Sequence, residues 1–139
     1  MYTVAPAGII QSRTNMPAPP RILLVDSDSD NRAVYGAILS YQGFDVLEAP
    51  DGPTALQLAR EEMPAVLVTE LALPMLSGFD LIKLLRSDER TQRISVIVLT
   101  AISFESERLR AVAAGCELFL CKPVEPLALA KAVASVLGN

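Results

Sequence analysis

The stretch Ile22-Leu23-Leu24-Val25-Asp26-Ser27-Asp28 decides how the rest of the chain is interpreted. Its first four residues form a continuous apolar run, which is typical of a strand covered on both faces in a parallel sheet. The run ends abruptly at Asp26, and residues that end a strand of such a sheet lie at its ligand-binding edge. The stretch therefore predicts a buried strand whose carboxyl end carries acidic side chains.

The rest of the chain repeats this pattern, with strand-like runs alternating with segments of helical spacing. Further strands are expected at 44–48, 65–70, 94–100 and 118–121, and helices at 30–42, from Gly52, at 79–86, at 106–114 and at 126–137. Apolar faces are predicted for the first and last helices, through Val34, Ile38 and Tyr41, and through Leu127, Ala130 and Val133. Five such β-α units predict an α/β fold, a doubly wound parallel sheet with right-handed crossovers.

The composition excludes several classes of function. The 139 residues include 12 Lys plus Arg, 16 Asp plus Glu and no His, for a formal net charge of −4. The commonest general base and metal ligand is therefore missing. A net negative chain without a basic run is not expected to bind nucleic acid, and no apolar run approaches the ~18 residues of a membrane span. The two cysteines, Cys116 and Cys121, are expected to be buried apolar residues of a reduced, soluble, cytoplasmic protein.

Residues 1–20 differ from the segment that follows them. They contain Pro6, Pro17, Pro19 and Pro20 among small and polar residues, with no clear period. This composition predicts a flexible N-terminal tail, with a docking peptide as the alternative, and a single domain at 21–139. Because the chain ends soon after the last helix, we expect either a stand-alone domain or a piece of a larger protein.

Polar side chains stand where the expected strands end. They are, in chain order, Asp26 and Asp28, Glu70, Thr100 and Lys122. Because the carboxyl ends of parallel strands form one ligand-binding edge, these groups are expected to converge. Carboxylates favour Mg²⁺, whereas an ammonium and a hydroxyl meet phosphate oxygens, so the set suits an oxyanion beside a hard cation.

These motifs resemble the receiver domain of bacterial response regulators, which act in two-component (phosphorelay) signal transduction. The resemblance covers Arg21 to about Leu137 and rests on the acidic end of the first strand, Leu73-Pro74 with Gly78, Leu99-Thr100-Ala101, and Lys122-Pro123. Thr100 lies 30 residues after position 70 and Lys122 lies 22 after Thr100, which are spacings of that family. The resemblance implies a flavodoxin-like (βα)5 sheet of order 2-1-3-4-5 and a signalling module that is not an enzyme.

The resemblance also implies roles for single residues. Glu70 stands at the phosphoacceptor position, and Asp26 with Ser27 stands where two acidic residues hold Mg²⁺. Thr100 and Phe119 correspond to the residues that move on activation. Lys122, followed by Pro123, corresponds to the lysine that bonds the phosphoryl oxygens.

Two of these positions depart from the family's pattern. Glu70 replaces an Asp, which moves the carboxylate about one bond outward, and misplacement by ~1 Å can cost ~10²-fold in rate. Ser27 replaces an acid and removes one charge from the metal site. We therefore predict an atypical receiver, or pseudo-receiver, that is not phosphorylated at Glu70 and binds no cofactor, or Mg²⁺ only weakly. The Glu70 carboxylate could approach Lys122 and Thr100 as a partial mimic, with charge −1 against roughly −1.5 to −2 for a phosphorylated side chain.

Structural interpretations compete with these roles. Asp28 is expected to cap the first helix, Glu70 to pair with Lys122, and Phe119 to belong to the core if the domain is locked. Two functional alternatives stay open: a Mg²⁺-dependent phosphatase resembling the haloacid-dehalogenase type with Asp26 as nucleophile, and a conventional receiver phosphorylated on Asp26 or Asp28.

The resemblance further implies how the domain would act. It would contact a signalling partner, either a histidine kinase or a downstream effector, through the face of the fourth helix, fifth strand and fifth helix. That face corresponds to Ser103 to Gly115, Phe119, and Leu127 to Val136. The sequence leaves the oligomeric state open.

Overall fold

Five parallel strands form one sheet in the order β2-β1-β3-β4-β5. The computed structural model describes residues 17–102 and 104–138. The strands are β1 (Arg21–Val25), β2 (Asp45–Ala49), β3 (Val66–Thr69), β4 (Ser95–Thr100) and β5 (Leu118–Cys121). The predicted α/β class, parallel sheet and flavodoxin-like strand order are confirmed.

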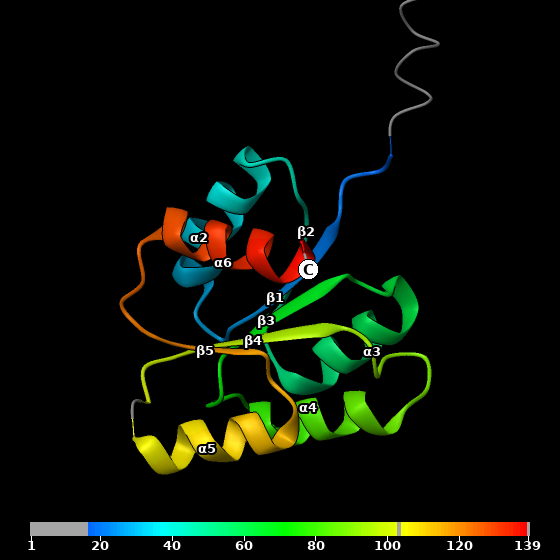
Figure 1. Ribbon diagram of the computed structural model, residues 1–139, viewed down its shortest axis with the longest axis vertical. Helices are drawn as coiled ribbons and strands as arrows, with labels where there is room; N and C mark the ends of the chain where they lie inside the picture. The colour runs from blue at the N-terminus through cyan, green and yellow to red at the C-terminus, as the bar shows by residue number, and fades with distance from the viewer. Residues whose placement is uncertain (1–16, 103, 139) are drawn as a thin grey trace, which may run out of the picture.

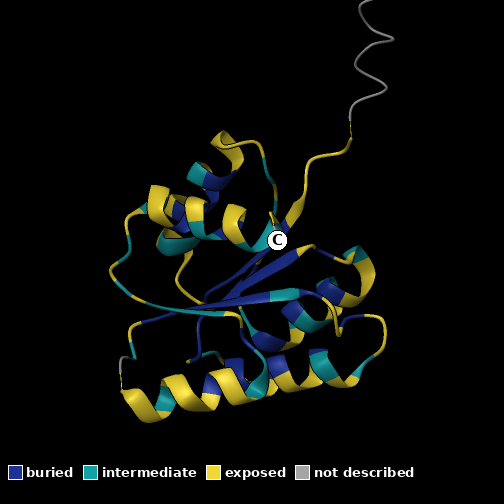
Figure 2. Ribbon diagram, viewed as in Figure 1, coloured by how far each residue is buried: buried dark blue, intermediate teal, exposed yellow. Residues whose placement is uncertain are grey.

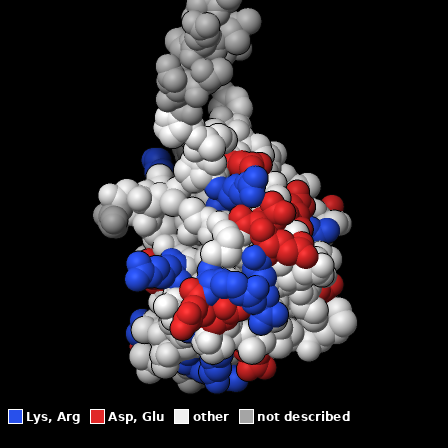
Figure 3. Space-filling model, turned by 90° about the vertical axis from the view of Figure 1, so that its right-hand side faces the viewer, with Lys and Arg blue, Asp and Glu red and all other residues white. Residues whose placement is uncertain are grey.

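Five helices in the described part of the chain cover the two faces of the sheet (Figure 1). They are α2 (Ser29–Tyr41), α3 (Gly52–Glu62), α4 (Gly78–Ser87), α5 (Glu105–Ala114) and α6 (Pro126–Leu137). In Figure 1, α2 and α6 lie on one face, and α3, α4 and α5 lie on the other. The bounds that the sequence predicted agree with these elements to within one residue. None of the described helices has the length and apolar character needed to cross a bilayer. On the face drawn in Figure 3, basic and acidic side chains lie next to one another.

The side chains of the strands contribute to two hydrophobic cores, one on each face of the sheet. Figure 2 shows the buried sheet between helices that are partly exposed. Side chains alternate across a strand, so Ile22 and Leu24 of β1 pack under α2 and α6, while Leu23 and Val25 pack under α3 and α4. All four are at most 2% exposed. The apolar run that opened the sequence is therefore a strand buried on both faces.

The predicted apolar face of α2 is right for Ile38, which packs against the core, and wrong for Val34 and Tyr41. Tyr35 and Leu39 face the sheet, whereas Val34 is 54% and Tyr41 is 85% exposed. Tyr35 can be buried because its hydroxyl donates a hydrogen bond to the carbonyl oxygen of Val124, 3.0 Å away. The apolar residues of this helix follow two overlapping helical spacings, one that includes Val34 and one that includes Tyr35. The contact of Tyr35 with the segment before α6 turns the second set toward the sheet.

In α6 the predicted face is only partly right. Ala130 and Val133 are buried in the core beneath α2 and α6, but Leu127 is 45% exposed and is not part of that core. The prediction for Cys121 is also wrong, since this residue ends the edge strand β5 and is exposed, while Cys116 is buried. Burial raises the pKa of the Cys116 thiol.

Glycine is required where α4 starts against the end of β3. A Cβ atom on Gly78 would collide with the carbonyl oxygen of Glu70 and lie 2.8 Å from the Cα atom of Leu71. The absence of a side chain thus lets α4 begin directly beneath the loop that carries Glu70. Gly36 in α2 is different, because its nearest non-helical neighbour would be the flexible Glu48 carboxylate at 3.4 Å.

Two glycine-to-alanine substitutions are expected to act in opposite directions. Gly78→Ala should lower the free energy of unfolding by about 1–3 kcal/mol, because backbone must move. Gly36→Ala should raise it by about 0.5–1 kcal/mol, because alanine is the better helix former and has room. Urea unfolding monitored by circular dichroism measures both, and equal losses would contradict the packing described for Gly78.

Candidate functional site

Four polar residues stand at the carboxyl ends of the strands, at one edge of the sheet. Asp26 and Glu70 directly follow β1 and β3, Thr100 ends β4, and Lys122 directly follows β5. The parallel order places β1 beside β3 and β4 beside β5, so these ends lie together. The convergence expected from the strand ends is therefore present for Asp26, Glu70 and Lys122, which are mostly buried. The Thr100 hydroxyl instead bonds to the Ile102 amide, and Asp28 caps α2.

Lys122 is shared by two carboxylates. Its Nζ atom lies 2.8 Å from Oδ2 of Asp26 and 3.1 Å from Oε1 of Glu70. The exposed fractions of the three side chains are 16% for Lys122 and 9% for each acid. The expected ion pair between Glu70 and Lys122 is present. A second ion pair, between Asp26 and the same ammonium, was not predicted. We refer to Asp26, Glu70 and Lys122 as the charged triad.

The second oxygen of Glu70 is held by the backbone. Oε2 accepts hydrogen bonds from the amides of Leu71, at 2.6 Å, and Ala72, at 3.4 Å. The additional methylene of Glu lets the carboxylate bend back onto its own loop while it still reaches Lys122. The expected approach to Lys122 is found, but the hydrogen bonds of the described residues include none between Glu70 and Thr100.

Asp26 is equally well satisfied. Its Oδ1 accepts from the amide of Asp28 at 2.9 Å, and its Oδ2 accepts from the Asn31 side-chain amide at 3.3 Å as well as from Lys122. The Arg32 guanidinium donates to the Asp26 carbonyl oxygen at 2.6 Å. Asn31 and Arg32 thus position the first acid, a role that sequence reasoning missed because polar residues early in a helix look like ordinary surface.

Asp28 is a helix cap, as expected. Its side chain accepts from the amides of Asp30 and Asn31, at 2.8 and 3.4 Å, at the N-terminus of α2. It also lies outside the charged triad, because none of its hydrogen bonds in the described structure involves Lys122. The residue between the two acids, Ser27, is exposed.

Thr100 and Phe119, the residues expected to move on activation, lie in or against the buried core. Thr100 is fully buried, and its hydroxyl accepts from the amide of Ile102 at 3.1 Å. Phe119 is partly buried and packs against the core beneath α3, α4 and α5. Lys122 is aligned with β4 by a hydrogen bond from its amide to the Thr100 carbonyl oxygen, 2.8 Å long, and precedes Pro123 through a cis peptide bond.

Each carboxylate oxygen of Asp26 and Glu70 already accepts a hydrogen bond, so the site offers a divalent cation no free carboxylate oxygen. The site offers two carboxylates, and one oxygen of each is already bonded to the Lys122 ammonium. Ser27 contributes no charge, and the described residues hold no group of three or more His, Cys, Asp or Glu that could ligate a metal. Mg²⁺ prefers near-octahedral oxygen ligands and would have to displace the ammonium.

Opposing effects act on Lys122. Burial lowers the pKa of its ammonium, whereas the hydrogen bonds and charges of Asp26 and Glu70 raise it, and the pKa ends above its ordinary value. Lys122 is therefore a cation at neutral pH. With both acids ionised, the triad carries one net negative charge inside a largely water-excluded edge of the sheet.

Comparison with known proteins identifies the fold's family. The family described as the response regulator receiver domain matches residues 22–134. The chain belongs to that family. Receivers are signalling modules that interact with histidine kinases and effectors and are not typically enzymes, so two-component signalling is the general setting of this chain.

Three similar proteins illustrate the range of the family. An uncharacterized 14.6-kDa protein in the sodA1 3' region of Leptolyngbya boryana is 38% identical over 112 residues, which cover 81% of this chain and 86% of that protein. The response regulator PleD of Caulobacter vibrioides is 32% identical over 116 residues, which cover 84% of this chain but only 26% of PleD. The receiver domain of the sensor histidine kinase PA1611 from Pseudomonas aeruginosa PAO1 superimposes with a TM-score of 0.81 at 28% identity, covering 88% of this chain and 100% of that one. In that structure a magnesium ion is coordinated in the active-site cleft.

Removing the shared cation should destabilise the domain. Lys122→Met leaves two buried carboxylates without their cation, and we expect the free energy of unfolding to fall by about 2–4 kcal/mol. Lys83→Met removes an exposed lysine from α4 and should change it by less than about 0.5 kcal/mol. Urea unfolding at pH 7 compares the two, and similar small effects would show that the triad does not stabilise the fold.

The effects of Lys122→Met and Lys83→Met on the free energy of unfolding should also differ in their pH dependence. Since the pKa of Lys122 is raised in the folded state above its ordinary value of 10.5, the triad's contribution is fully present below that pH. It is lost as the pH rises through the folded-state pKa. The stability difference between native protein and Lys122→Met should therefore stay constant across neutral pH and shrink only in strongly alkaline solution, while that of Lys83→Met stays flat.

Proposed function

We propose that this chain is an atypical receiver, a pseudo-receiver whose state is not set by phosphorylation at Glu70. It would act in two-component signalling by protein–protein contact, as a stand-alone receiver or as part of a longer protein. The sequence-based expectation of a cytoplasmic location belongs to this proposal.

The engagement of both oxygens of Glu70 carries the proposal. One oxygen is bonded to Lys122 at 3.1 Å and the other to the Leu71 amide at 2.6 Å. Attack on a phosphodonor requires an acceptor oxygen that is free and aligned within a fraction of an ångström. Glu70 would have to break a charge-assisted hydrogen bond to present either oxygen.

The missing metal acid supports the same conclusion. Developing charge on a transferring phosphoryl group is normally neutralised by cations, and metal ions supply most of that charge. With Ser27 in place of an acid, and with both remaining carboxylates paired to Lys122, we infer that Mg²⁺ binds weakly or not at all. Phosphotransfer would then lack both a free nucleophile and its electrostatic support.

The partner surface follows from exposed apolar residues on α5 and at its N-cap, Phe104. Phe104, Leu109 and Val112 are 72%, 54% and 48% exposed, beside the solvated Glu105 and Arg108. We propose that α5, β5 and α6 together contact the signalling partner, a histidine kinase or a downstream effector. Ser103, which the sequence included in this face, lies outside the described residues.

The two alternatives, a phosphatase and a conventional receiver, both require an acid to leave its present hydrogen bonds. As a phosphatase nucleophile, or as the phosphoacceptor of a conventional receiver, Asp26 would have to leave Lys122, Asn31 and the Asp28 amide. Asp28 would have to leave its capping position. No contact in the described structure favours either alternative over the pseudo-receiver.

Incubation with Mg²⁺ and a small-molecule phosphodonor, followed by intact-mass measurement, tests the proposal. The native chain should gain no phosphoryl group, and Glu70→Asp/Ser27→Asp should gain one, because the double variant restores both the acceptor and the metal acid. Glu70→Asp alone should gain little.

Three results would contradict this account. Phosphorylation of the native chain, mapped with Asp26→Asn and Asp28→Asn, would return the protein to conventional phosphorelay. A double variant as inert as the native chain would show that Glu70 and Ser27 are not the cause of the loss. Release of inorganic phosphate from a phosphate ester would instead favour the phosphatase.

A further inference from the structure

The outer face of α6 is unusually apolar for a surface helix. Lys131 is the one charged residue among the twelve from Pro126 to Leu137. Leu127 is 45% exposed, and Ala128 and Ala134 are also exposed. A surface helix normally turns a charged or polar face to water, so an aliphatic outer face indicates that something apolar covers it.

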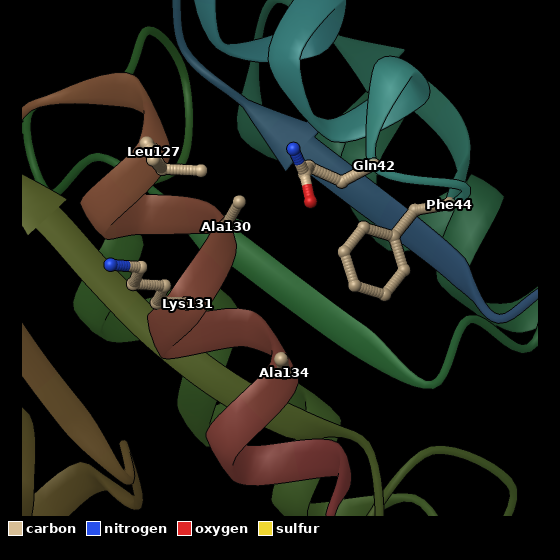
Figure 4. A pocket seen from close by; sticks show the side chains of 6 residues that line it. All are labelled: Gln42, Phe44, Leu127, Ala130, Lys131 and Ala134. Carbon is tan, nitrogen blue, oxygen red and sulfur yellow. The ribbon is translucent and has the colours of Figure 1, made fainter.

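A groove runs between this helix and the end of α2. It has a volume of about 210 Å³ and is lined by Gln42, Phe44, Leu127, Ala130, Lys131 and Ala134 (Figure 4). In Figure 4, Gln42 and Phe44 form one wall and the α6 side chains form the other. Sites for small organic ligands usually occupy ~300–1,000 Å³, so this groove suits a few aliphatic side chains better than a cofactor.

We propose that the N-terminal segment around Ile9 and Ile10 docks in this groove of its own domain. Residues 1–16 lie outside the described part of the chain, so the argument rests on their sequence and on where the described chain begins. This inference does not depend on whether Glu70 is phosphorylated.

The chain enters the domain at the edge of the groove. The Asp45 amide donates a hydrogen bond of 2.9 Å to the Pro20 carbonyl oxygen, and Asp45 directly follows the groove residue Phe44. Figure 1 shows the chain entering β1 at the end of the sheet where α6 also ends. The segment is therefore tethered beside the surface that it would cover.

The length and chemistry of the segment match the groove. Six residues separate Ile10 from Pro17, enough to span up to about 25 Å at ~3.3–3.6 Å per residue. The groove extends along α6 from Ala134 to Leu127, about 10 Å at 1.5 Å per residue. Ile9 and Ile10 are two adjacent branched aliphatic side chains, and Arg13 is the one charged side chain in residues 1–16.

The tether favours this occupant over a second molecule. A short linker gives an attached segment an effective concentration on the order of millimolar, far above the concentration of a separate copy in dilute solution. A groove that binds two isoleucines only weakly is therefore filled by its own chain first. Any protein that uses the α2–α6 surface would have to displace the segment.

Amide spectra of the full-length ¹⁵N-labelled chain test the docking directly. Ile9→Ser/Ile10→Ser should shift the amides of Phe44, Lys131 and Ala134, and the shifts should not depend on protein concentration. Val4→Ser, which removes an aliphatic side chain outside the pair, should leave them in place. Unchanged groove amides in the double variant would overturn the proposal, and so would shifts that grow with concentration, because these would indicate a second copy.

A matched pair of groove variants gives an independent readout. Ala134→Glu places a charge in the groove, whereas Ala128→Glu places the same charge on an exposed position of α6 that does not line it. Trypsin cleavage after Arg13 should become about threefold faster in Ala134→Glu, the factor expected if a segment docked for two thirds of the time is released. It should be unchanged in Ala128→Glu, and equal rates in both variants would overturn the docking.

Discussion

The sharing of the Lys122 ammonium between Asp26 and Glu70 is the constraint on which the functional edge of this protein depends. Each carboxylate lies within about 3 Å of the same nitrogen, and all three side chains are mostly buried. Two acids brought together without a cation would repel each other and lose hydration, so the lysine makes their proximity possible. The ends of β1, β3 and β5 are thereby tied together across the sheet.

This arrangement has a chemical consequence. In a receiver, a metal ion and a phosphoryl group would occupy the space between these strand ends, and their charges would define the signalling state. Here the internal ammonium and the Glu70 carboxylate already satisfy one another, while Leu71 and Asp28 supply amide donors to the remaining oxygens. The chain keeps the fold of the family. We infer that the charges of a metal ion and a phosphoryl group, which can bind and leave, are replaced by those of Lys122 and Glu70, which are fixed parts of the chain.

Much of the fold was predictable because each strand and the polar residue that ends it are adjacent in the sequence. Each strand is an apolar run that stops at a polar residue, as at Val25-Asp26, so element order and the positions of Glu70 and Lys122 followed from the pattern. The face of α2 was predicted only in part, with Ile38 right and Val34 wrong, because Val34 and Tyr35 begin two overlapping helical spacings and only tertiary contact selects between them. The sharing of Lys122 by two acids could not be predicted from the sequence, because Asp26 and Lys122 are 96 residues apart and their distance depends on side-chain placement.

The fixed-charge account is tested most directly by a titration of the native chain that is monitored by amide spectra. Mg²⁺ is added first, and beryllofluoride is then added in the presence of Mg²⁺. Beryllofluoride takes a carboxylate oxygen as the fourth ligand of its beryllium and so mimics a phosphorylated side chain without phosphoryl transfer. The result therefore reports whether Glu70 can present a free oxygen and whether Mg²⁺ binds, not how fast a phosphodonor reacts. We predict no saturable shift of the amides at Ser27, Glu70 and Lys122 in the native chain, and a saturable shift in Glu70→Asp/Ser27→Asp. Saturable binding by the native chain would contradict the account, because Asp26 and Glu70 would then prefer the metal to Lys122.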